Sequence, residues 1–355
     1  MGLAGCTQIN WRVRLEVSYN ETTTTNDQKA ITEDVSQGSA EGSGKEPENG
    51  TTTRRLAPVM PCFHPLTAWQ SPAGGPVVFK PSRSHHRMLQ LPCGQCIGCR
   101  MLKSQMWATR CVHEASQHNQ NCFVTLTYHD KHLPWDGSLN KTHFQNFAKR
   151  LRKSVDYKIR YFMCGEYGAK LNRPHYHALL FGHDFDDKTL WTSKDGINTF
   201  TSERLEALWP FGFSTVGDIT WESAAYCSRY TTKKITGKDA ENHYWRQTFT
   251  DLEVQLEPEY ANMSLKPGIG ATWFEKYKRD CFPSDFITHG GKKHRIPRYY
   301  DQLAEQHNEI DLATIKGNRR RKAEEWHHEC TPKRLAAREA CATARLDLLK
   351  RNLES

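Results

Sequence analysis

The sequence predicts an α+β fold in which a small antiparallel sheet carries helices on one side. Two observations predict it. The elements after residue 120 follow the order strand, helix, strand, strand, helix, strand, helix. Turn-forming residues, including Gly168 and Asn172, connect the second and third strands, so these two are expected to form an antiparallel hairpin.

Each element has its own local signal. Alternating β-branched and aromatic residues predict strands at 123–128, 159–166, 175–181 and 213–219. Apolar residues at helical spacing predict helices at 101–113, 142–155, 202–208 and 220–234. Thr142 and Thr220 are the expected N-caps of the second and fourth helices, and the fourth is expected to end near Gly237.

The chain divides by composition into five regions. Residues 1–59 are polar and rich in Thr, Ser, Gly and Glu, which predicts a disordered leader. Residues 60–100 are rich in Pro, Gly and Cys, which predicts mostly loops. The predicted sheet and its helices occupy 101–238, a mixed extension follows over 239–301, and 302–355 are predicted to form a charged helical tail.

The composition restricts the class of protein. Of 355 residues, 37% are hydrophobic, and no apolar run reaches the ~18 residues that a membrane span needs. The start of the chain lacks a signal-peptide pattern, so the twelve cysteines are expected in a reducing compartment, where clustered thiols favour metal over disulfides. Residues 1–59 carry 6 Lys and Arg against 8 Asp and Glu, so the rest of the chain carries +11 against a total of +9. A basic body suits a polyanion such as nucleic acid.

Two histidines on one predicted strand are the strongest chemical signal. His175 and His177 project from the same face of the strand, and paired imidazoles are ready metal ligands. Glu166 lies nine positions before His175, and the predicted hairpin would bring its carboxylate beside them. Two His and one carboxylate leave open coordination positions and favour Mg²⁺ or Mn²⁺. Rivals for the third ligand follow the first strand, namely His129, Asp130 and His132.

A pair of tyrosines on a predicted helix is the second signal. Tyr226 and Tyr230 are four residues apart, so both hydroxyls lie on one helix face. Lys233 and Lys234 follow and would neutralise phosphate oxygens or lower the pKa of a phenol. Alone, such a pair is more often simple packing, but beside a divalent metal it suits phosphodiester transesterification. A phenol then attacks phosphorus, keeps the DNA end as a phosphotyrosine and releases a 3′-OH.

Four short motifs stand in order along the chain, at 93–100 (CGQCIGCR), 123–128 (FVTLTY), 164–168 (CGEYG) and 173–182 (RPHYHALLFG). A Tyr-x-x-x-Tyr-x-x-Lys helix motif follows them. This set resembles that of the HUH endonucleases, and most closely the rolling-circle replication initiators of microvirus phages of the gokushovirus type. The likeness covers about residues 60–238.

This resemblance implies a ferredoxin-like, or RRM-like, antiparallel sheet. It assigns the metal to Glu166, His175 and His177, and the catalytic step to Tyr226, Tyr230, Lys233 and Lys234. The implied activity is metal-dependent nicking and rejoining of single-stranded DNA at the phage origin, in the cytoplasm of the bacterial host. The implied partners are single-stranded DNA, the origin duplex, and the host DNA polymerase and helicase, because no helicase P-loop is visible. No membrane partner is expected.

Cysteines gather before the first predicted helix. Cys93, Cys96 and Cys99 form a C-x₂-C-x₂-C run, and Cys62 or Cys111 would complete four thiolates. Zinc in such a site would order the loop-rich segment. Free buried thiols and an iron–sulfur cluster are the alternatives that the spacing leaves open. The cysteines at positions 122, 164 and 227 are expected to be small core residues.

Basic residues are the expected contacts to the DNA backbone. They are 318–322 in the tail and, in the predicted domain, Lys149, Arg150, Arg152, Lys153 and Arg173. A solvated charged face is the alternative. Two rival functions are a non-enzymatic, zinc-containing nucleic-acid-binding protein and a relaxase or transposase of a plasmid or mobile element. The first would leave the paired histidines and tyrosines without a role.

Overall fold

A computed structural model describes residues 62–168, 171–194, 196–229, 234–235, 237, 239–247 and 252–348. The predicted disordered leader, 1–59, lies outside the described residues. Tyr230 and Lys233 also lie outside them. The predicted end of the fourth helix near Gly237 falls where the chain is described only in part.

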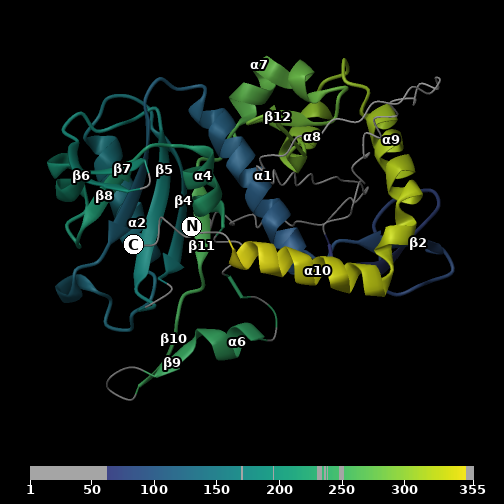
Figure 1. Cartoon of the computed structure of the whole chain (residues 1–355), viewed down its shortest axis with the longest axis horizontal. Helices are drawn as coiled ribbons and strands as arrows, with labels where there is room; N and C mark the ends of the chain where they lie inside the picture. The colour runs from purple at the N-terminus through teal and green to yellow at the C-terminus, as the bar shows by residue number, and fades with distance from the viewer. Residues whose placement is uncertain are drawn as a thin grey trace, which may run out of the picture.

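A seven-stranded antiparallel sheet forms the body of the molecule (Figure 1). Its strand order is β11-β4-β5-β3-β8-β7-β6. The four strands predicted from alternation are present within a few residues of their predicted bounds, as β3 (Asn121–Thr127), β4 (Arg160–Tyr167), β5 (Pro174–Phe181) and β8 (Ser214–Gly217). Three further strands extend the sheet, namely β6 (Thr189–Lys194), β7 (Ile197–Thr201) and β11 (Tyr260–Met263).

The β4–β5 hairpin forms as predicted. Gly168 N donates to the Arg173 carbonyl at 3.0 Å, and Asn172 N donates to the Gly168 carbonyl at 3.0 Å. Asn172 has a φ of 50°, a left-handed conformation that Asn adopts more readily than most residues. The turn chemistry therefore fixes the register of the two strands that carry the predicted metal ligands.

Helices cover both faces of the sheet, so the prediction of helices on one side is wrong. On one face, called the α2 face, lie α2 (Lys141–Lys153) and α3 (Glu203–Leu208). On the other face, called the site face, lie α1 (Ile97–Ala115) and α4 (Trp221–Ser228). The reason lies in the central strands, since β4 and β5 are buried along both rows of alternating side chains. A sheet that is apolar on both faces needs cover on both.

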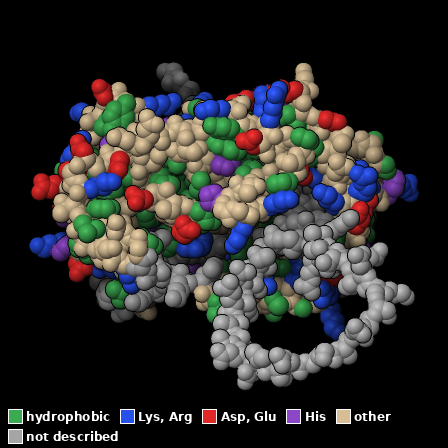
Figure 2. Space-filling model, turned by 45° about the horizontal axis from the view of Figure 1, so that its top comes forward, with side chains coloured by type: hydrophobic (Ala, Val, Ile, Leu, Met, Phe, Trp, Pro, Cys, Tyr) green, Lys and Arg blue, Asp and Glu red, His purple; other side chains and the backbone are tan. Residues whose placement is uncertain are grey.

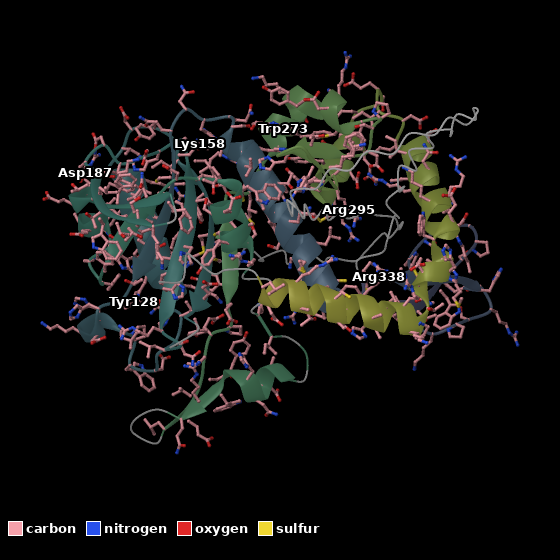
Figure 3. All side chains as sticks on the ribbon, viewed as in Figure 1. Tyr128, Lys158, Asp187, Trp273, Arg295 and Arg338 are labelled. Atoms are coloured by element: carbon pink, nitrogen blue, oxygen red, sulfur yellow. The ribbon has the colours of Figure 1, made fainter. Side chains whose placement is uncertain are left out.

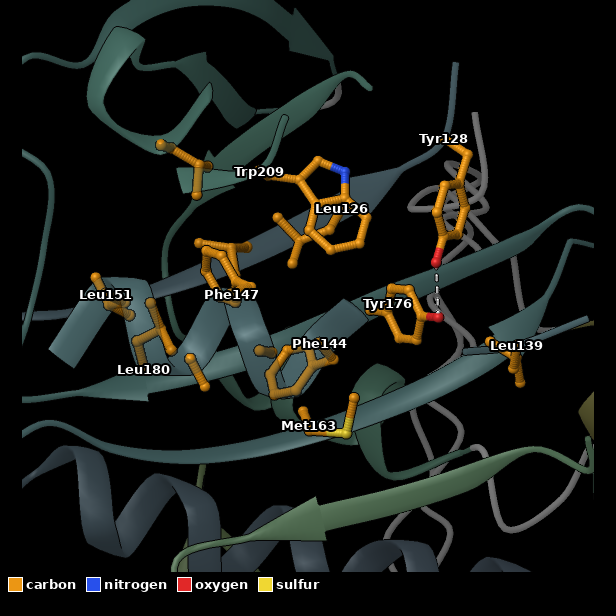
Figure 4. Packing of buried hydrophobic residues seen from close by; sticks show 14 of the residues in the cluster. Leu126, Tyr128, Leu139, Phe144, Phe147, Leu151, Met163, Tyr176, Leu180 and Trp209 are labelled. Carbon is orange, nitrogen blue, oxygen red and sulfur yellow. Dashed lines mark hydrogen bonds between the residues drawn. The ribbon is translucent and has the colours of Figure 1, made fainter. Parts of the chain in front are cut away.

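The α2 face contains the larger core (Figure 4). Phe144, Phe147 and Leu151 project from one side of α2 at helical spacing. They pack against the even-numbered residues of β3, β5 and β8 and the odd-numbered residues of β4. The hydroxyls of Tyr128 and Tyr176 are 2.9 Å apart within this core. Asn140, rather than the predicted Thr142, is the N-cap of α2, because its side-chain oxygen accepts from the backbone N–H of residues 142 and 143.

The site face is closed by a helix pair. Helix α1 packs against α4, and Thr220 caps α4 through a reciprocal capping box with Ser223, as the sequence predicted for the cap. The core beneath these helices takes the odd-numbered residues of β3 and β5 and the even-numbered residues of β4. The predicted core positions Cys122, Cys164 and Cys227 are fully buried, which confirms them.

Residues after 239 are more ordered than the mixed loops that the sequence predicted. They include α6 (Asp239–Tyr244), β9 (Trp245–Gln247), β10 (Glu253–Gln255), α7 (Ala271–Cys281), β12 (Ile287–His289), β13 (Lys292–His294) and α8 (Arg298–Ala304). Buried Glu114 on α1 joins this part to the sheet, because it pairs with Arg160 on β4 and accepts from Gly270 N at 2.7 Å. Removing one partner of such a buried pair strongly destabilises the fold, because it leaves the other charge buried and unpaired.

The ends of the described chain meet. The segment predicted to be loops contains a hairpin of β1 (Leu66–Gln70) and β2 (Arg87–Leu91). The predicted helical tail is present as α9 (Leu312–Glu325) and α10 (Pro332–Asp347). Helix α10 contacts α1, and Figure 1 shows it crossing the end of α1 away from α7.

Candidate active site

Strand register brings three predicted metal ligands together. Glu166 on β4 faces His175 on β5, and His177 lies two residues along the same face. Oε1 of Glu166 is 3.2 Å from Nε2 of His175 and 3.5 Å from Nε2 of His177. One ligand atom from each of the three residues lies within 4.8 Å of the others. We call these residues the Glu–His–His triad.

Hydrogen bonds on the far side of each imidazole set its orientation. Nδ1 of His175 is 3.1 Å from the Arg173 carbonyl, and Nδ1 of His177 is 3.0 Å from Oγ1 of Thr125. A carbonyl only accepts, so Nδ1 of His175 carries a proton, and Nε2 is the ring nitrogen that faces the Glu166 carboxylate, at 3.2 Å. Both imidazoles thus direct Nε2 at the same carboxylate oxygen. The donor set, two imidazole nitrogens and one carboxylate oxygen, therefore fits a divalent ion.

The charge state of the carboxylate supports the same fit. The Glu166 side chain is 1% exposed. Burial favours the neutral carboxyl group, but hydrogen bonds and charge from His175 and His177 outweigh it and hold the pKa of Glu166 well below its ordinary value. The carboxylate is therefore ionised at neutral pH, the form that binds a cation.

The rival ligands lie apart from the triad. Asp130, in a 3₁₀ turn after β3, is exposed and pairs with Arg173 at 2.6 Å. Nδ1 of His132 is 3.2 Å from the Phe211 carbonyl. Nδ1 of His129 is 3.3 Å from the backbone N–H of Lys131. Over the part of the chain that the structure describes, none of the three shares a ligand group with Glu166.

Tyr226 lies against the triad. It projects from α4, and its hydroxyl donates to Glu166 Oε1 at 3.1 Å. Its ring meets that of His177 edge-on, with centroids 4.9 Å apart, and the ring of Phe123 stacks on the His177 imidazole, with centroids 5.4 Å apart. The residue is 4% exposed, so packing fixes its ring. The structure thus places this phenol beside Glu166 and His177.

Three cationic groups lie on or near this helix pair. The guanidinium of Arg229, at the C-cap of α4, is 5.1 Å from the Tyr226 ring. Partial desolvation and the nearby Lys234 ammonium lower the pKa of Lys103 on α1. Of these three residues, only Lys234 is predicted from the sequence. Arg229 could have been found from its position three residues after Tyr226, whereas Lys103 needed the α1–α4 packing.

The predicted DNA-binding residues do not gather at the triad. The basic residues of α2 lie over the opposite face of the sheet, where Arg150 donates to the Leu208 carbonyl at 2.9 Å. Within 318–322, Arg319 is buried and pairs with Asp285 and Asp301. Arg173 alone lies beside the triad, directly before β5. Figure 2 shows one face of the molecule on which basic and acidic side chains are interspersed.

The sequence did not predict a role for two exposed aromatic residues on the site face, Trp191 and Phe213. Phe213 O accepts from Thr127 N at 2.9 Å, and Thr127 faces His175 in the sheet. Phe213 is 42% exposed, Trp191 is 56% exposed, and their ring centroids are 4.9 Å apart. Gly212 permits this approach, because a Cβ there would collide with the backbone of residues 127–129. The site lies at the end of the sheet marked by Tyr128 in Figure 3, away from Lys158.

A second group of ligand atoms lies outside this site. The sulfur atoms of Cys62, Cys93, Cys96 and Cys99 lie within 4.8 Å of one another. We call them the thiol cluster. Cys111, the alternative fourth member, is instead buried in the core of the site face.

Comparison with known proteins places the chain in a family. A family model described as Replication-associated protein ORF2/G2P matches residues 121–235, from β3 through α4. Replication-associated protein ORF2 of Spiroplasma virus 4 is 36% identical over 250 residues, which cover 66% of this chain and 74% of that protein. The chain belongs to this family of replication-associated proteins.

Two further relatives in the family come from other phages. Replication-associated protein VP4 of Bdellovibrio phage phiMH2K is 33% identical over 254 residues, covering 68% of this chain and 76% of the relative. Replication-associated protein ORF4 of Chlamydia phage 1 is 31% identical over 223 residues, covering 60% and 53%. The predicted resemblance to microvirus replication-associated proteins is therefore confirmed. No solved structure matches the chain.

The structure also bears on the membrane prediction. Among the helices in the described ranges, none combines the length and the apolar character that crossing a membrane requires.

Proposed function

We propose that this chain initiates phage DNA replication by nicking and rejoining one DNA strand, with Tyr226 as the nucleophile. The observation that carries the proposal is the Tyr226 hydroxyl, 3.1 Å from the Glu166 oxygen on which two imidazoles converge. Membership of a family of phage replication-associated proteins supports it.

The proposed reaction exchanges one phosphodiester for another. The phenol oxygen of Tyr226 bonds to phosphorus, the bond from phosphorus to the 3′ oxygen breaks, and the phenol proton ends on that 3′ oxygen. Because no water is consumed, the released 3′-OH can later attack the phosphotyrosine and restore the strand. Glu166 orients the phenol by accepting its hydrogen bond, and the edge-on contact with His177 holds the ring.

Glu166, His175 and His177 are the residues that would hold a divalent ion, Mg²⁺ or Mn²⁺. When bound, the ion would polarise the phosphate and stabilise the charge that develops on it. Thr125 and the Arg173 carbonyl hold the two imidazoles with Nε2 directed at Glu166. The rings are therefore already oriented when a cation binds, and binding costs little side-chain entropy.

Residues near α4 complete the proposal. Tyr230, outside the described residues and four positions after Tyr226 in the sequence, would be a second nucleophile, so that strands exchange without release. Lys233, also outside them, and Lys234 would assist the reaction. Lys103 and Arg229 add positive charge near the phosphate. The host DNA polymerase and helicase and the host cytoplasm are the corresponding partners and place of action.

The exposed pair Trp191 and Phe213 would bind unpaired bases of the strand. Directly facing residues of antiparallel strands project from one face, so Phe213, Thr127 and His175 lie in a row that leads to the triad. Aromatic faces stack on any base, and such contacts favour single-stranded over paired DNA.

The finer fold assignment belongs to the same proposal. Apart from the β6–β7 hairpin inserted between β5 and α3, the elements β3, α2, β4, β5, α3 and β8 follow one another as a βαββαβ unit. Both helices of this unit lie on the α2 face, and its strand order is β4-β5-β3-β8. This is the arrangement of a ferredoxin-like sheet. Helices α1 and α4 would then be additions that close the site face.

The test is a covalent adduct between protein and DNA. The full chain is incubated with single-stranded oligonucleotides that tile the replication origin of its phage, with Mn²⁺ or Mg²⁺, and resolved on a denaturing gel. We expect a metal-dependent adduct that Tyr226→Phe reduces at least ~10³-fold and that the Tyr226→Phe/Tyr230→Phe pair abolishes, because the nucleophile is absent.

Tyr161→Phe is the matched control, since this tyrosine packs against the core of the α2 face. It should form the adduct at the level of the unaltered chain. An adduct that survives in the double variant would contradict the assignment of the tyrosines. Binding to every oligonucleotide without an adduct would favour the rival function, a non-enzymatic nucleic-acid-binding protein.

A further inference from the structure

The thiol cluster at the start of α1 has the dimensions of a four-sulfur metal site. Cys96 is the N-cap of α1 and Cys99 lies in its first turn, while Cys62 approaches from a segment 31 residues before Cys93. The sulfur atoms of Cys62 and Cys96 are 3.9 Å apart. Four sulfurs bound at about 2.3 Å to one tetrahedral ion would lie roughly 3.8 Å apart.

Backbone N–H groups point at these sulfur atoms. Phe63 N donates to Cys96 Sγ at 3.3 Å, Cys93 N to Cys62 Sγ at 3.2 Å, and Cys96 N to Cys93 Sγ at 3.2 Å. Hydrogen bonds to sulfur favour the thiolate, the form that binds metal. The backbone therefore favours thiolates in this small volume, and a bound cation would offset the repulsion between them.

The surroundings of the cluster point to a structural role. Three of its four cysteines are buried, and Cys93 is half-buried. Among the described residues, few apolar side chains pack with them, namely Phe63, Ile97 and Ala342. So small a core gives little burial to hold a loop-rich segment in place, and a metal would supply what the core lacks.

The cluster also contacts the far end of the chain. Ala342 of α10 packs against it, and His64 Nε2 lies 2.8 Å from a carboxylate oxygen of Glu339. The guanidinium of Arg338 lies 5.9 Å from the ring of Phe63 (Arg338 is labelled in Figure 3). The segment that supplies Cys62 is thus part of the surface on which α10 rests.

We propose that Cys62, Cys93, Cys96 and Cys99 bind one zinc ion, which joins the segment 62–99 to the start of α1 and forms the surface on which α10 docks. The cysteines bind as thiolates and release their protons to solvent, without any change of oxidation state. Four thiolates leave no open position, so the ion is structural. This proposal does not depend on the proposed nicking reaction.

Metal content of the purified full chain tests it. We expect about one zinc per chain by elemental analysis, lost in Cys93→Ser. Cys93 is chosen because it is the least buried of the four. Cys341→Ser is the matched control, because Cys341 is exposed and lies beside Ala342 but outside the cluster, and it should keep the zinc. His177→Ala should also keep it, which separates this site from the triad.

A second measurement covers the case in which Cys93→Ser fails to fold. Metal removed from the unaltered chain is replaced with Co²⁺, whose tetrahedral thiolate complexes absorb strongly in the visible and near-ultraviolet. Thiolate bands that zinc then displaces would support the site. Absence of zinc with no cobalt–thiolate bands, iron in place of zinc, or retention of zinc in Cys93→Ser would each overturn the proposal.

The docking of α10 has its own readout. Hydrogen exchange in α10 and in the β1–β2 hairpin should speed up at least tenfold after zinc removal, whereas exchange in β3 and β5 should change much less. Equal protection of α10 with and without metal would overturn the claim that zinc forms its docking surface.

Discussion

The Glu–His–His triad and the thiol cluster are both groups of ligand side chains, but different parts of the fold assemble them. The triad comes from facing residues of two paired strands, so strand register determines which atoms meet. The thiol cluster takes three members from one short turn into a helix and the fourth from a segment 31 residues earlier. The first is built by long-range sheet pairing, the second mostly by local spacing.

The difference in donors separates their chemistry. The triad offers three metal-ligand atoms beside the phenol of Tyr226. One of its imidazoles, that of His175, has a side chain that is 15% exposed. The thiol cluster offers four sulfurs, to which backbone N–H groups donate. An incomplete donor set next to a reactive hydroxyl suits catalysis, and a complete set suits structure.

The largest expected effect removes a ligand from one site and leaves the other intact. Glu166→Gln or His177→Ala should reduce the protein–DNA adduct by at least ~10²-fold, because the proposed divalent ion would lose a ligand. Adduct yield against Mn²⁺ concentration measures the loss, and elemental analysis of the same samples should still find the zinc. Loss of zinc from these variants would show that the two sites are not independent.

A smaller effect is expected from the neighbour of the triad. Thr125→Val removes the hydroxyl that lies 3.0 Å from Nδ1 of His177 but keeps the shape of the side chain. We expect the Mn²⁺ concentration for half-maximal adduct to rise ~10–100-fold, as for other groups that orient a metal ligand. Thr215→Val is the control, since Thr215 faces Thr125 across β3 and β8. Equal shifts in both variants would argue against an orienting role.

The aromatic pair gives the next effect. Trp191→Ala should weaken binding of single-stranded DNA by ~1–3 kcal/mol, about 5- to 150-fold in Kd, because a base loses its stacking surface. Fluorescence anisotropy measures it, with Trp245→Ala as control, since Trp245 is 48% exposed on β9, outside the seven-stranded sheet. If both variants bind equally well, the strand does not cross the Trp191–Phe213 surface.

The smallest effect concerns the contact between the thiol-cluster segment and α10. His64→Ala removes the pair with Glu339, whose side chains are 66% and 28% exposed. Exposed pairs contribute up to about 1 kcal/mol, so Tm should fall by roughly 3 °C or less. Differential scanning calorimetry at low and high salt checks it. A fall of 10 °C would mean that this pair, rather than the metal, holds α10.

Local sequence signals predicted the central elements well and the sheet edges poorly. Strands β3, β4 and β5 follow clear alternation and turn chemistry, so their faces, and with them the triad, could be predicted. Strand β11 pairs with β4 from about a hundred residues away, and the short β6–β7 hairpin is largely exposed, so neither has a strong local pattern. Coverage of the site face by α1 and α4 was missed because amphipathic spacing does not reveal which face of a sheet a helix covers.

The sequence by itself determined which ligand side chains share a strand face, which tyrosine lies on the helix after β8, and which cysteines share a turn. These are consequences of periods of two and 3.6 residues, which the chain carries locally. Only the tertiary structure decided that Thr125 holds His177, that Cys62 rather than Cys111 joins the thiol cluster, and that α2 with its basic residues lies opposite the triad. Those outcomes depend on contacts between segments that are distant in the sequence. Such contacts are selected by the close packing of the whole core, which local sequence patterns do not encode.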